Sequence, residues 1–206
     1  MPEIDTVIFD IGNVLIRWDP RNLYGRMGLN EAETAAIMAE TGLLEVNHRL
    51  LDAGAPFSET IAELASRFPH RAEVIHAFHT RWPEMLGGAI EANAALLRRL
   101  RTAGTPVHAI TNFSRTKFDI ARSLFPFLDD FDELVVSGDI GLVKPDPEIF
   151  ELLIRRRNLA PRTAVFIDDS APNIETARRL GFATIHFDER TTDLEAELAR
   201  LGVLVP

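Results

Sequence analysis

Residues 6–16 read TVIFDIGNVLI, an apolar run with β-branched residues that stops at a single carboxylate, Asp10. A short and continuously apolar run is typical of a strand that is buried on both faces of a parallel sheet. We expect Gly12 and Asn13 to supply the unusual backbone angles of a sharp exit from this strand. Ligands of open α/β sheets bind at the carboxyl ends of the strands, so Asp10 is a candidate site residue; the alternative is a helix N-cap.

The second half of the chain predicts strands that alternate with helices. Apolar segments that read as strands lie at residues 107–111, 134–137, 164–168 and 183–187, and helical patterns separate and follow them. Such alternation implies right-handed crossovers and a parallel sheet. We therefore expect an α/β fold with a Rossmann-like parallel sheet and helices on both of its faces.

The segment between the first and second strands has a different pattern. Residues 21–86 are helical throughout, and Asn30 with Glu33 predicts a capping box for a helix that ends at Gly42. A wholly helical insertion at this point is typical of a cap rather than of the sheet. The predicted division is a catalytic core formed by residues 1–16 and 87–206 and a helical cap formed by residues 17–86.

The composition narrows the class of protein. The chain has 206 residues, of which 46% are hydrophobic, so it can bury a substantial core. It has no cysteine, which rules out disulfides and thiolate metal sites and fits a reducing compartment. A net charge of −9 argues against a nucleic-acid partner. No targeting segment or membrane-spanning run is evident, so we expect a soluble, cytoplasmic protein without membrane or nucleic-acid partners. Its oligomeric state is not predicted.

Polar residues stand at the predicted strand ends, where an ordinary connection does not require them. They are Asp10, Thr111, Asn112, Lys144, Asp168 and Asp169. Parallel strands bring their carboxyl ends to one edge of the sheet, so these groups are expected to meet there. Three carboxylates around one ammonium would raise one another's pKa values unless a cation joined them. An oxygen-only ligand set indicates Mg²⁺ as that cation.

Four ordered segments carry a resemblance to a known family. They read FDIGNV (9–14), ITN (110–112), KPDP (144–147) and FIDDS (166–170). The set resembles the motifs of the haloacid dehalogenase-like hydrolases, a superfamily dominated by phosphatases, and it extends to Asn173 and Gly181. The first motif looks most like that of the capped subgroup with Asp-x-Gly-Asn, which includes sugar-phosphate phosphatases such as the α-glucose-1-phosphate phosphatase.

The resemblance implies a role for each residue at the metal and the nucleophile. Asp10 would attack phosphorus and form an aspartyl-phosphate, which water then hydrolyses. Asp10, the backbone carbonyl of Gly12 and Asp169 would hold Mg²⁺. Asp168 would act through water in the outer shell or orient Lys144.

The same resemblance implies the groups that bind phosphate and substrate. Thr111, Asn112 and Asn13 would contact the phosphate, and Lys144 would add a positive charge. Arg17 would line the entrance and contact the substrate; the alternative is a solvated arginine. Asn173 corresponds to a supporting polar position of the family, with an ordinary polar residue near a helix start as the alternative.

Gly12 departs from the family pattern. Many of these phosphatases carry a second aspartate there, which protonates the leaving oxygen, and general acids of this kind contribute about 10²–10⁴-fold in rate. A cap residue or water could supply the proton, or the leaving group could be a good one such as an anomeric oxygen. Asp19, His48 and Asp52 are candidates, each with a surface polar residue as the alternative.

Three functions remain open. The leading hypothesis is a Mg²⁺-dependent phosphatase for a small phosphorylated metabolite, with a sugar phosphate favoured. The first alternative is a 2-haloacid dehalogenase, in which Asp10 attacks carbon without a metal; the unneutralised pair Asp168 and Asp169 would repel its carboxylate substrate. The second alternative is a non-catalytic phosphate sensor that lost turnover with the acid at Gly12.

Overall fold

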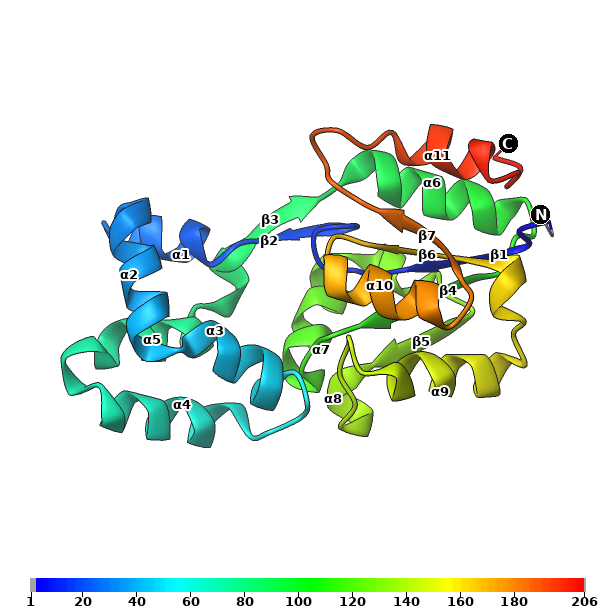
Figure 1. Ribbon diagram of the computed structural model, residues 1–206. Coiled ribbons are helices and arrows are strands. Elements are labelled where there is room, and N and C mark those ends of the chain that lie inside the picture. The colour runs from blue at the N-terminus through cyan, green and yellow to red at the C-terminus, as the bar shows by residue number, and fades with distance from the viewer. Residues whose placement is uncertain (1–2, 206) are drawn as a thin grey trace.

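The computed structural model describes residues 3–205 and has a five-stranded parallel sheet at its centre (Figure 1). The strand order is β5 (Glu133–Val136), β4 (Val107–Thr111), β1 (Thr6–Phe9), β6 (Ala164–Asp168) and β7 (Ala183–His186). β1 pairs in parallel with β4 on one side and with β6 on the other. The predicted Rossmann-like sheet, with the first strand at its centre, is confirmed.

Helices cover both faces of this sheet. One face packs against α6 (Glu91–Thr102), α7 (Arg115–Leu124) and α11 (Leu194–Arg200), and the other against α9 (Pro147–Arg157) and α10 (Ala171–Arg179). Alternate residues of β1 divide between the two faces, with Val7 and Phe9 in one buried cluster and Ile8 in the other. This alternation explains the uninterrupted apolar run, because every side chain of the strand is buried.

The inserted segment forms a separate group of helices beyond the carboxyl ends of the strands (Figure 1). It contains α1 (Pro20–Arg26), α2 (Glu31–Thr41), α3 (Leu43–Val46), the π-helical turn η1 (Asn47–Leu51), α4 (Phe57–Arg67) and α5 (Ala72–Thr80). The predicted capping box of α2 is confirmed by reciprocal hydrogen bonds between Asn30 and Glu33, and Gly42 ends the helix with φ of 65°.

A two-stranded ribbon joins this helical group to the sheet, and the sequence analysis did not predict it. β2 (Ile16–Trp18) pairs in antiparallel fashion with β3 (Leu86–Ala89), so both predicted cap boundaries fall within these strands. Short strands with a Gly87-Gly88 pair carry almost no strand signal. Gly87 is nevertheless required, because a Cβ there would lie 2.9 Å from the Cβ of Arg17.

The backbone turn that follows β1 agrees with the prediction at Asn13 and differs from it at Gly12. Asn13 has φ of 53°, as predicted for a sharp turn, but Gly12 keeps a φ outside the left-handed region, so the prediction for Gly12 is wrong. The buried amide of Asn93 on α6 donates a 2.7 Å hydrogen bond to the carbonyl of Val14. The turn after Asp10 is therefore fixed by Asn13 and by α6.

The third predicted strand is shifted by one residue in the structure. β5 begins and ends one residue before the predicted segment, because Ser137 starts the short helix α8 (Ser137–Ile140).

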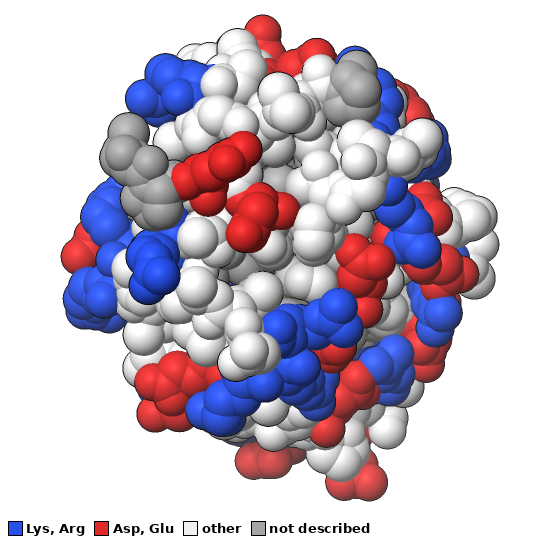
Figure 2. Space-filling view, turned by 90° about the vertical axis from the view of Figure 1, so that its right-hand side faces the viewer, with Lys and Arg blue, Asp and Glu red and all other residues white. Residues whose placement is uncertain are grey.

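Figure 2 shows the face at the amino ends of the strands, where acidic and basic side chains interleave. Among residues 3–205, no helix combines the length and the apolar character needed to cross a bilayer.

Candidate active site

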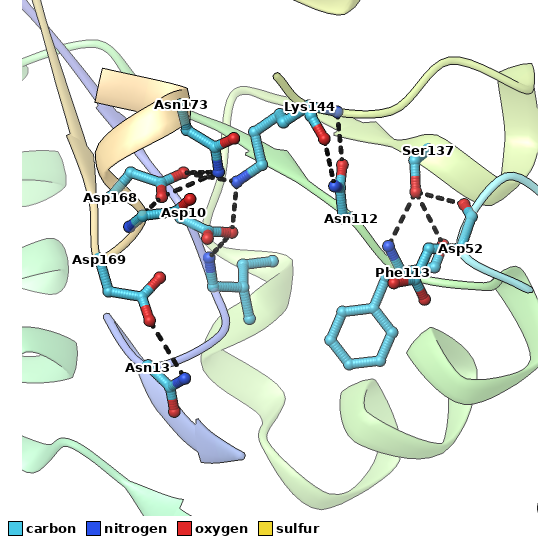
Figure 3. A network of polar contacts seen from close by, with 12 residues as sticks. Asp10, Asn13, Asp52, Asn112, Phe113, Ser137, Lys144, Asp168, Asp169 and Asn173 are labelled. Carbon is cyan, nitrogen blue, oxygen red and sulfur yellow. Dashed lines mark hydrogen bonds and ion pairs between the residues drawn. The ribbon is translucent and has the colours of Figure 1, made fainter. Parts of the chain in front are cut away.

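A buried ion-pair cluster lies at the carboxyl edge of the sheet (Figure 3). The Nζ atom of Lys144 lies 2.9 Å from Oδ1 of Asp10 and 2.7 Å from Oδ2 of Asp168. The side chains of Lys144 and Asp168 are 1% and 0% exposed, and that of Asp10 is 11% exposed. The backbone N–H of Ile11 also donates to Oδ1 of Asp10 at 2.6 Å. Asp10 is thus held by two donors, and its least buried edge can face a ligand.

Asn112, which follows β4, fixes the backbone of Lys144. Its Oδ1 accepts from the Lys144 N–H at 2.8 Å, and its Nδ2 donates to the Lys144 carbonyl at 2.8 Å. This two-point contact explains how a lysine from a loop reaches a fixed position beside β1. The sequence analysis placed Asn112 in the site but did not predict this contact.

Asp168, the last residue of β6, accepts hydrogen bonds at both of its carboxylate oxygens. Besides Lys144, it accepts from the Ser170 N–H at 2.8 Å and from Nδ2 of Asn173 at 3.0 Å to each oxygen. Both oxygens are therefore engaged, which favours orientation of Lys144 over a role as a direct metal ligand. The contact to Asp168 also favours the supporting position for Asn173 over an ordinary residue at a helix start.

Asp169 and Asn13 form the outer side of the cluster. Nδ2 of Asn13 donates to Oδ2 of Asp169 at 3.2 Å, and Oδ1 of Asn13 accepts from the Trp18 N–H at 3.0 Å. The left-handed turn at Asn13 thus connects β1, β6 and β2. Thr111, which is buried, lines the same cavity as Asp10 and Asp169.

The electrostatics of the cluster reflect an excess of negative charge. Burial raises the pKa of Asp10 to about 7; the neighbouring Lys144 opposes the rise and Asp168 adds to it. Burial and Asp168 also raise the pKa of Asp169. For Lys144, burial disfavours the charged form, but Asp10 and Asp168 outweigh it and raise the pKa above the usual lysine value. A further cation next to Asp10 and Asp169 would favour the ionised form of both carboxylates.

The donor set fits Mg²⁺. Carboxylate oxygens of Asp10, Asp168 and Asp169 all lie within 4.8 Å of one another. Since the oxygens of Asp168 are occupied by protein donors, Asp10 and Asp169 are the two carboxylates suited to hold the ion. One or two carboxylates together with substrate oxygens and water are the usual surroundings of protein-bound Mg²⁺.

A cavity of about 1070 Å³ opens above this cluster and reaches the helical insertion. Its core side includes the residues that the sequence analysis brought together: Asp10, Gly12, Asn13, Thr111, Asn112, Lys144, Asp169 and Asn173. Its far side is formed mainly by Trp18, Asn47, His48, Arg49, Leu50, Asp52, Phe57 and Trp82. The cavity therefore combines a charged floor with a partly apolar roof.

Two predicted candidates do not line this cavity. Arg17 turns outward, where its guanidinium binds Glu189 and donates to the Ala89 carbonyl at 2.8 Å. Arg17 therefore does not line the cavity, and the alternative of a solvated arginine describes its position better than the expected contact with substrate. Asp19 caps α1 and pairs with Arg21.

Lys117 on α7 is a cavity residue that the sequence analysis missed. Its Nζ donates to the His79 carbonyl at 2.8 Å and lies 4.5 Å from the centre of the Phe57 ring. These contacts, and a second one to Nδ1 of His79, include no carboxylate of the described chain. Burial lowers its pKa to about 8. The available signal was its place beside Phe118 on the apolar stripe of α7.

A charged floor below a helical roof forms the candidate site, and comparison with known proteins identifies the family. The profile of the haloacid dehalogenase-like hydrolases matches residues 4–181. The chain belongs to this family.

Three related proteins illustrate its range. Sesquiterpene phosphatase astK of Aspergillus oryzae is 25% identical over 191 residues, which cover 88% of this chain and 89% of that protein. D-ribitol-5-phosphate phosphatase of Bacteroides thetaiotaomicron is 37% identical over 73 residues, or 35% of each chain. The HAD family enzyme bt-2542 of the same organism, solved with magnesium and inorganic phosphate, has a TM-score of 0.71 at 20% identity and covers 94% of this chain and 98% of its own.

The extent of these matches differs. The chain spans 10% of one curated relative and 34% of another, so several relatives contain much sequence that has no counterpart here. At 20% identity, the solved structure supports the fold alone.

Proposed function

We propose that the protein is a Mg²⁺-dependent phosphatase that removes phosphate from a small phosphorylated metabolite through an aspartyl-phosphate on Asp10. The observation that carries this proposal is the position of Lys144, which lies between Asp10 and Asp168 at the floor of the cavity. Its ammonium can attract a phosphate to the carboxylate that must attack it. The family membership and the phosphatases among the relatives support the same reaction.

In the proposed first half-reaction, a carboxylate oxygen of Asp10 attacks phosphorus and the bond to the ester oxygen breaks. We infer that Lys144, Thr111 and Asn112, which line the cavity, stabilise the phosphate oxygens as negative charge shifts among them. In the second half-reaction, water attacks the same phosphorus and releases inorganic phosphate. Asp168 and Asn173 keep Lys144 in place throughout.

Mg²⁺, held by Asp10, the Gly12 carbonyl and Asp169, would neutralise charge between the nucleophile and the phosphate. Asn13 would orient Asp169 for this task through its 3.2 Å hydrogen bond. The helical segment 17–86 would serve as the cap that encloses the substrate, with the ribbon of β2 and β3 as its connection.

For the substrate, we favour a sugar or polyol phosphate, as in the subgroup with Asp-x-Gly-Asn. The relative named for D-ribitol 5-phosphate supports this choice. The apolar roof formed by Trp18, Leu50, Phe57 and Trp82 favours a second candidate, an apolar phosphate ester, and the relative named for a sesquiterpene supports it. Both classes belong in the first substrate panel.

The two alternatives of the sequence analysis are less well supported. A 2-haloacid would bring its carboxylate to a floor that already has three carboxylates and one ammonium. A sensor without turnover would need no ordered nucleophile, whereas Asp10 is fixed by two donors.

The test is phosphate release from D-ribitol 5-phosphate, glucose 1-phosphate, farnesyl phosphate and p-nitrophenyl phosphate, with Mg²⁺ and with a chelator. We expect release that depends on Mg²⁺ and is abolished in Asp10→Asn. Asp146→Asn is the matched control, because Asp146 lines the cavity but is exposed and stands at the N-cap position of α9. Halide release from 2-chloropropionate without a metal, or phosphate binding without turnover, would contradict the proposal.

A further inference from the structure

The proposed reaction requires a proton for the leaving oxygen, and the residue at position 12 does not supply it. An alkoxide leaving group needs a proton as its bond to phosphorus breaks, and Gly12 has no side chain that could provide one. Packing does not explain the glycine, since a Cβ built at Gly12 would meet no atom within 4 Å. The donor must therefore be sought on another wall of the cavity.

The roof of the cavity carries an acid–base pair. On the turn η1, Nδ1 of His48 lies 3.5 Å from Oδ2 of Asp52, and Nδ2 of Asn47 donates to the same carboxylate oxygen at 2.9 Å. The side chain of Asp52 is 10% exposed, whereas that of His48 is 61% exposed. A buried carboxylate thus lies beside Nδ1 of His48, and the exposed His48 side chain lines the cavity that contains Asp10. Single π-helical turns of this kind are frequent at functional sites.

Contacts with the core hold this pair over the charged floor. The Ser137 hydroxyl donates to the backbone carbonyl of Asp52 at 2.5 Å (Figure 3). Gly54 has φ of 98°, and a Cβ there would lie 2.9 Å from the carbonyl oxygen of Gly138. Close approach of two backbones therefore docks the loop after η1 on α8. Both His48 and Asp52 line the cavity that contains Asp10.

The charges around His48 favour its protonated form. Hydrogen bonding to Asp52 raises the pKa of His48 above the usual histidine value; partial burial opposes the rise, and the charge of Asp169 adds to it. The other charged groups that face the cavity are Arg49 on the same turn and, from the core, Asp10, Lys117, Lys144 and Asp146.

Building on the phosphatase function proposed above, we propose that His48 is the proton donor to the leaving oxygen and that Asp52 is its positioning residue. As Asp10 forms its bond to phosphorus, the electron pair of the breaking ester bond stays on the ester oxygen. That oxygen takes the proton from Nε2 of His48 and leaves as an alcohol, so His48 becomes neutral.

The second half-reaction restores the proton. The oxygen of water attacks phosphorus and its proton passes to Nε2 of neutral His48, while the electron pair of the Asp10–phosphate bond returns to the Asp10 carboxylate. The products are hydrogen phosphate, ionised Asp10 and protonated His48, so charge and atoms balance over the cycle. One cap residue thus acts as acid and then as base.

The leaving group tests this assignment. We would measure kcat/KM for p-nitrophenyl, phenyl and benzyl phosphate, which are similar in shape. The need of the leaving oxygen for a proton increases in that order. His48→Gln is expected to lower kcat/KM for benzyl phosphate by about 10²-fold or more and to leave that for p-nitrophenyl phosphate almost unchanged. His76→Gln, a histidine on α5 that does not line the cavity, is the matched control and should change neither.

The pH profile tests the role of Asp52. Wild-type kcat/KM for benzyl phosphate should fall at high pH as His48 loses its proton, and His48→Gln should lose this dependence. Asp52→Asn removes the contact that raises the pKa of His48, so the fall should move to lower pH, whereas kcat/KM for p-nitrophenyl phosphate, whose leaving group needs no proton, should change far less.

Two outcomes separate the failure of this inference from the failure of the proposed function. If the wild-type protein releases phosphate from none of the three esters, the phosphatase function itself is wrong. If it releases phosphate but His48→Gln lowers kcat/KM equally for all three esters, or for none, His48 is not the proton donor. Thermal unfolding of each variant would identify a loss that comes from misfolding.

Discussion

The chain has two lysines, Lys117 and Lys144, and they line one cavity in opposite surroundings. Lys144 lies between the carboxylates of Asp10 and Asp168, which raise its pKa. Lys117 lies against the ring of Phe57 and the carbonyl of His79, and burial lowers its pKa to about 8. The same side chain is thus a permanent cation in one place and a readily deprotonated amine in the other.

This difference separates the tasks of the floor and the roof. At the floor, fixed opposite charges surround the proposed phosphate site and leave little freedom of position. Where α7 meets the roof, the Lys117 ammonium has no carboxylate partner among the described residues and lies over the rings of Phe57 and Trp82, whose faces attract cations but do not neutralise them. We therefore expect the floor to control the rate of the chemical step and the roof to control the choice of leaving group.

The largest effect is expected for Lys144→Met. Removal of one partner from a buried ion-pair cluster leaves uncompensated carboxylates and typically costs ~3–5 kcal/mol in the free energy of unfolding. The loss of the charge beside Asp10 should also lower kcat for p-nitrophenyl phosphate by about 10²–10³-fold. Urea unfolding and steady-state kinetics measure the two effects.

The same substitution at the other lysine is the control. Lys117→Met should keep most of the stability and most of the activity towards p-nitrophenyl phosphate. Equal losses in the two variants would contradict the division between floor and roof. Lys144→Arg, which keeps the charge, should retain more stability than Lys144→Met.

The sequence predicted the floor well because its groups follow strongly apolar strands. β4 and β6 match the expected segments 107–111 and 164–168, so Asp10, Thr111, Lys144 and Asp168 come together as parallel strands require. The ribbon of β2 and β3 was missed, because strands of three and four residues that contain Arg17 and two glycines have no distinct pattern.

The roof was predicted less well because its contacts depend on residues that are far apart in the sequence. Arg17 was placed near the entrance, but its direction is decided by Glu189, 172 positions later. Ser137 reaches Asp52 over 85 positions, and Lys117 reaches His79 over 38. Sequence periodicity places a backbone on a helix or strand, but side-chain pairs across two packed segments carry no local signal.

An intermediate effect is expected for Asp168→Asn. The amide keeps the size of the side chain and can still accept one hydrogen bond from Asn173 or Ser170, but it removes one of the two charges that hold Lys144. We expect kcat to fall by about tenfold, less than for Lys144→Met, with little change in KM for Mg²⁺ because Asp168 does not hold the ion. A large rise in KM for Mg²⁺ would instead make Asp168 a direct ligand.

The smallest effect is expected for the pH dependence of stability at Lys117. Its pKa is about 8 in the folded protein against 10.5 for a free lysine, so between these values the unfolded chain binds more protons than the folded one. The free energy of unfolding should therefore increase as the pH rises through this window. Lys117 should contribute on the order of 2 kcal/mol to this increase. Lys117→Met should lose this slope, whatever its stability at neutral pH. If urea unfolding shows the same dependence of stability on pH in both proteins, the pKa of Lys117 is not lowered in the folded protein. Lys117 and Lys144 would then differ only in the groups that they contact.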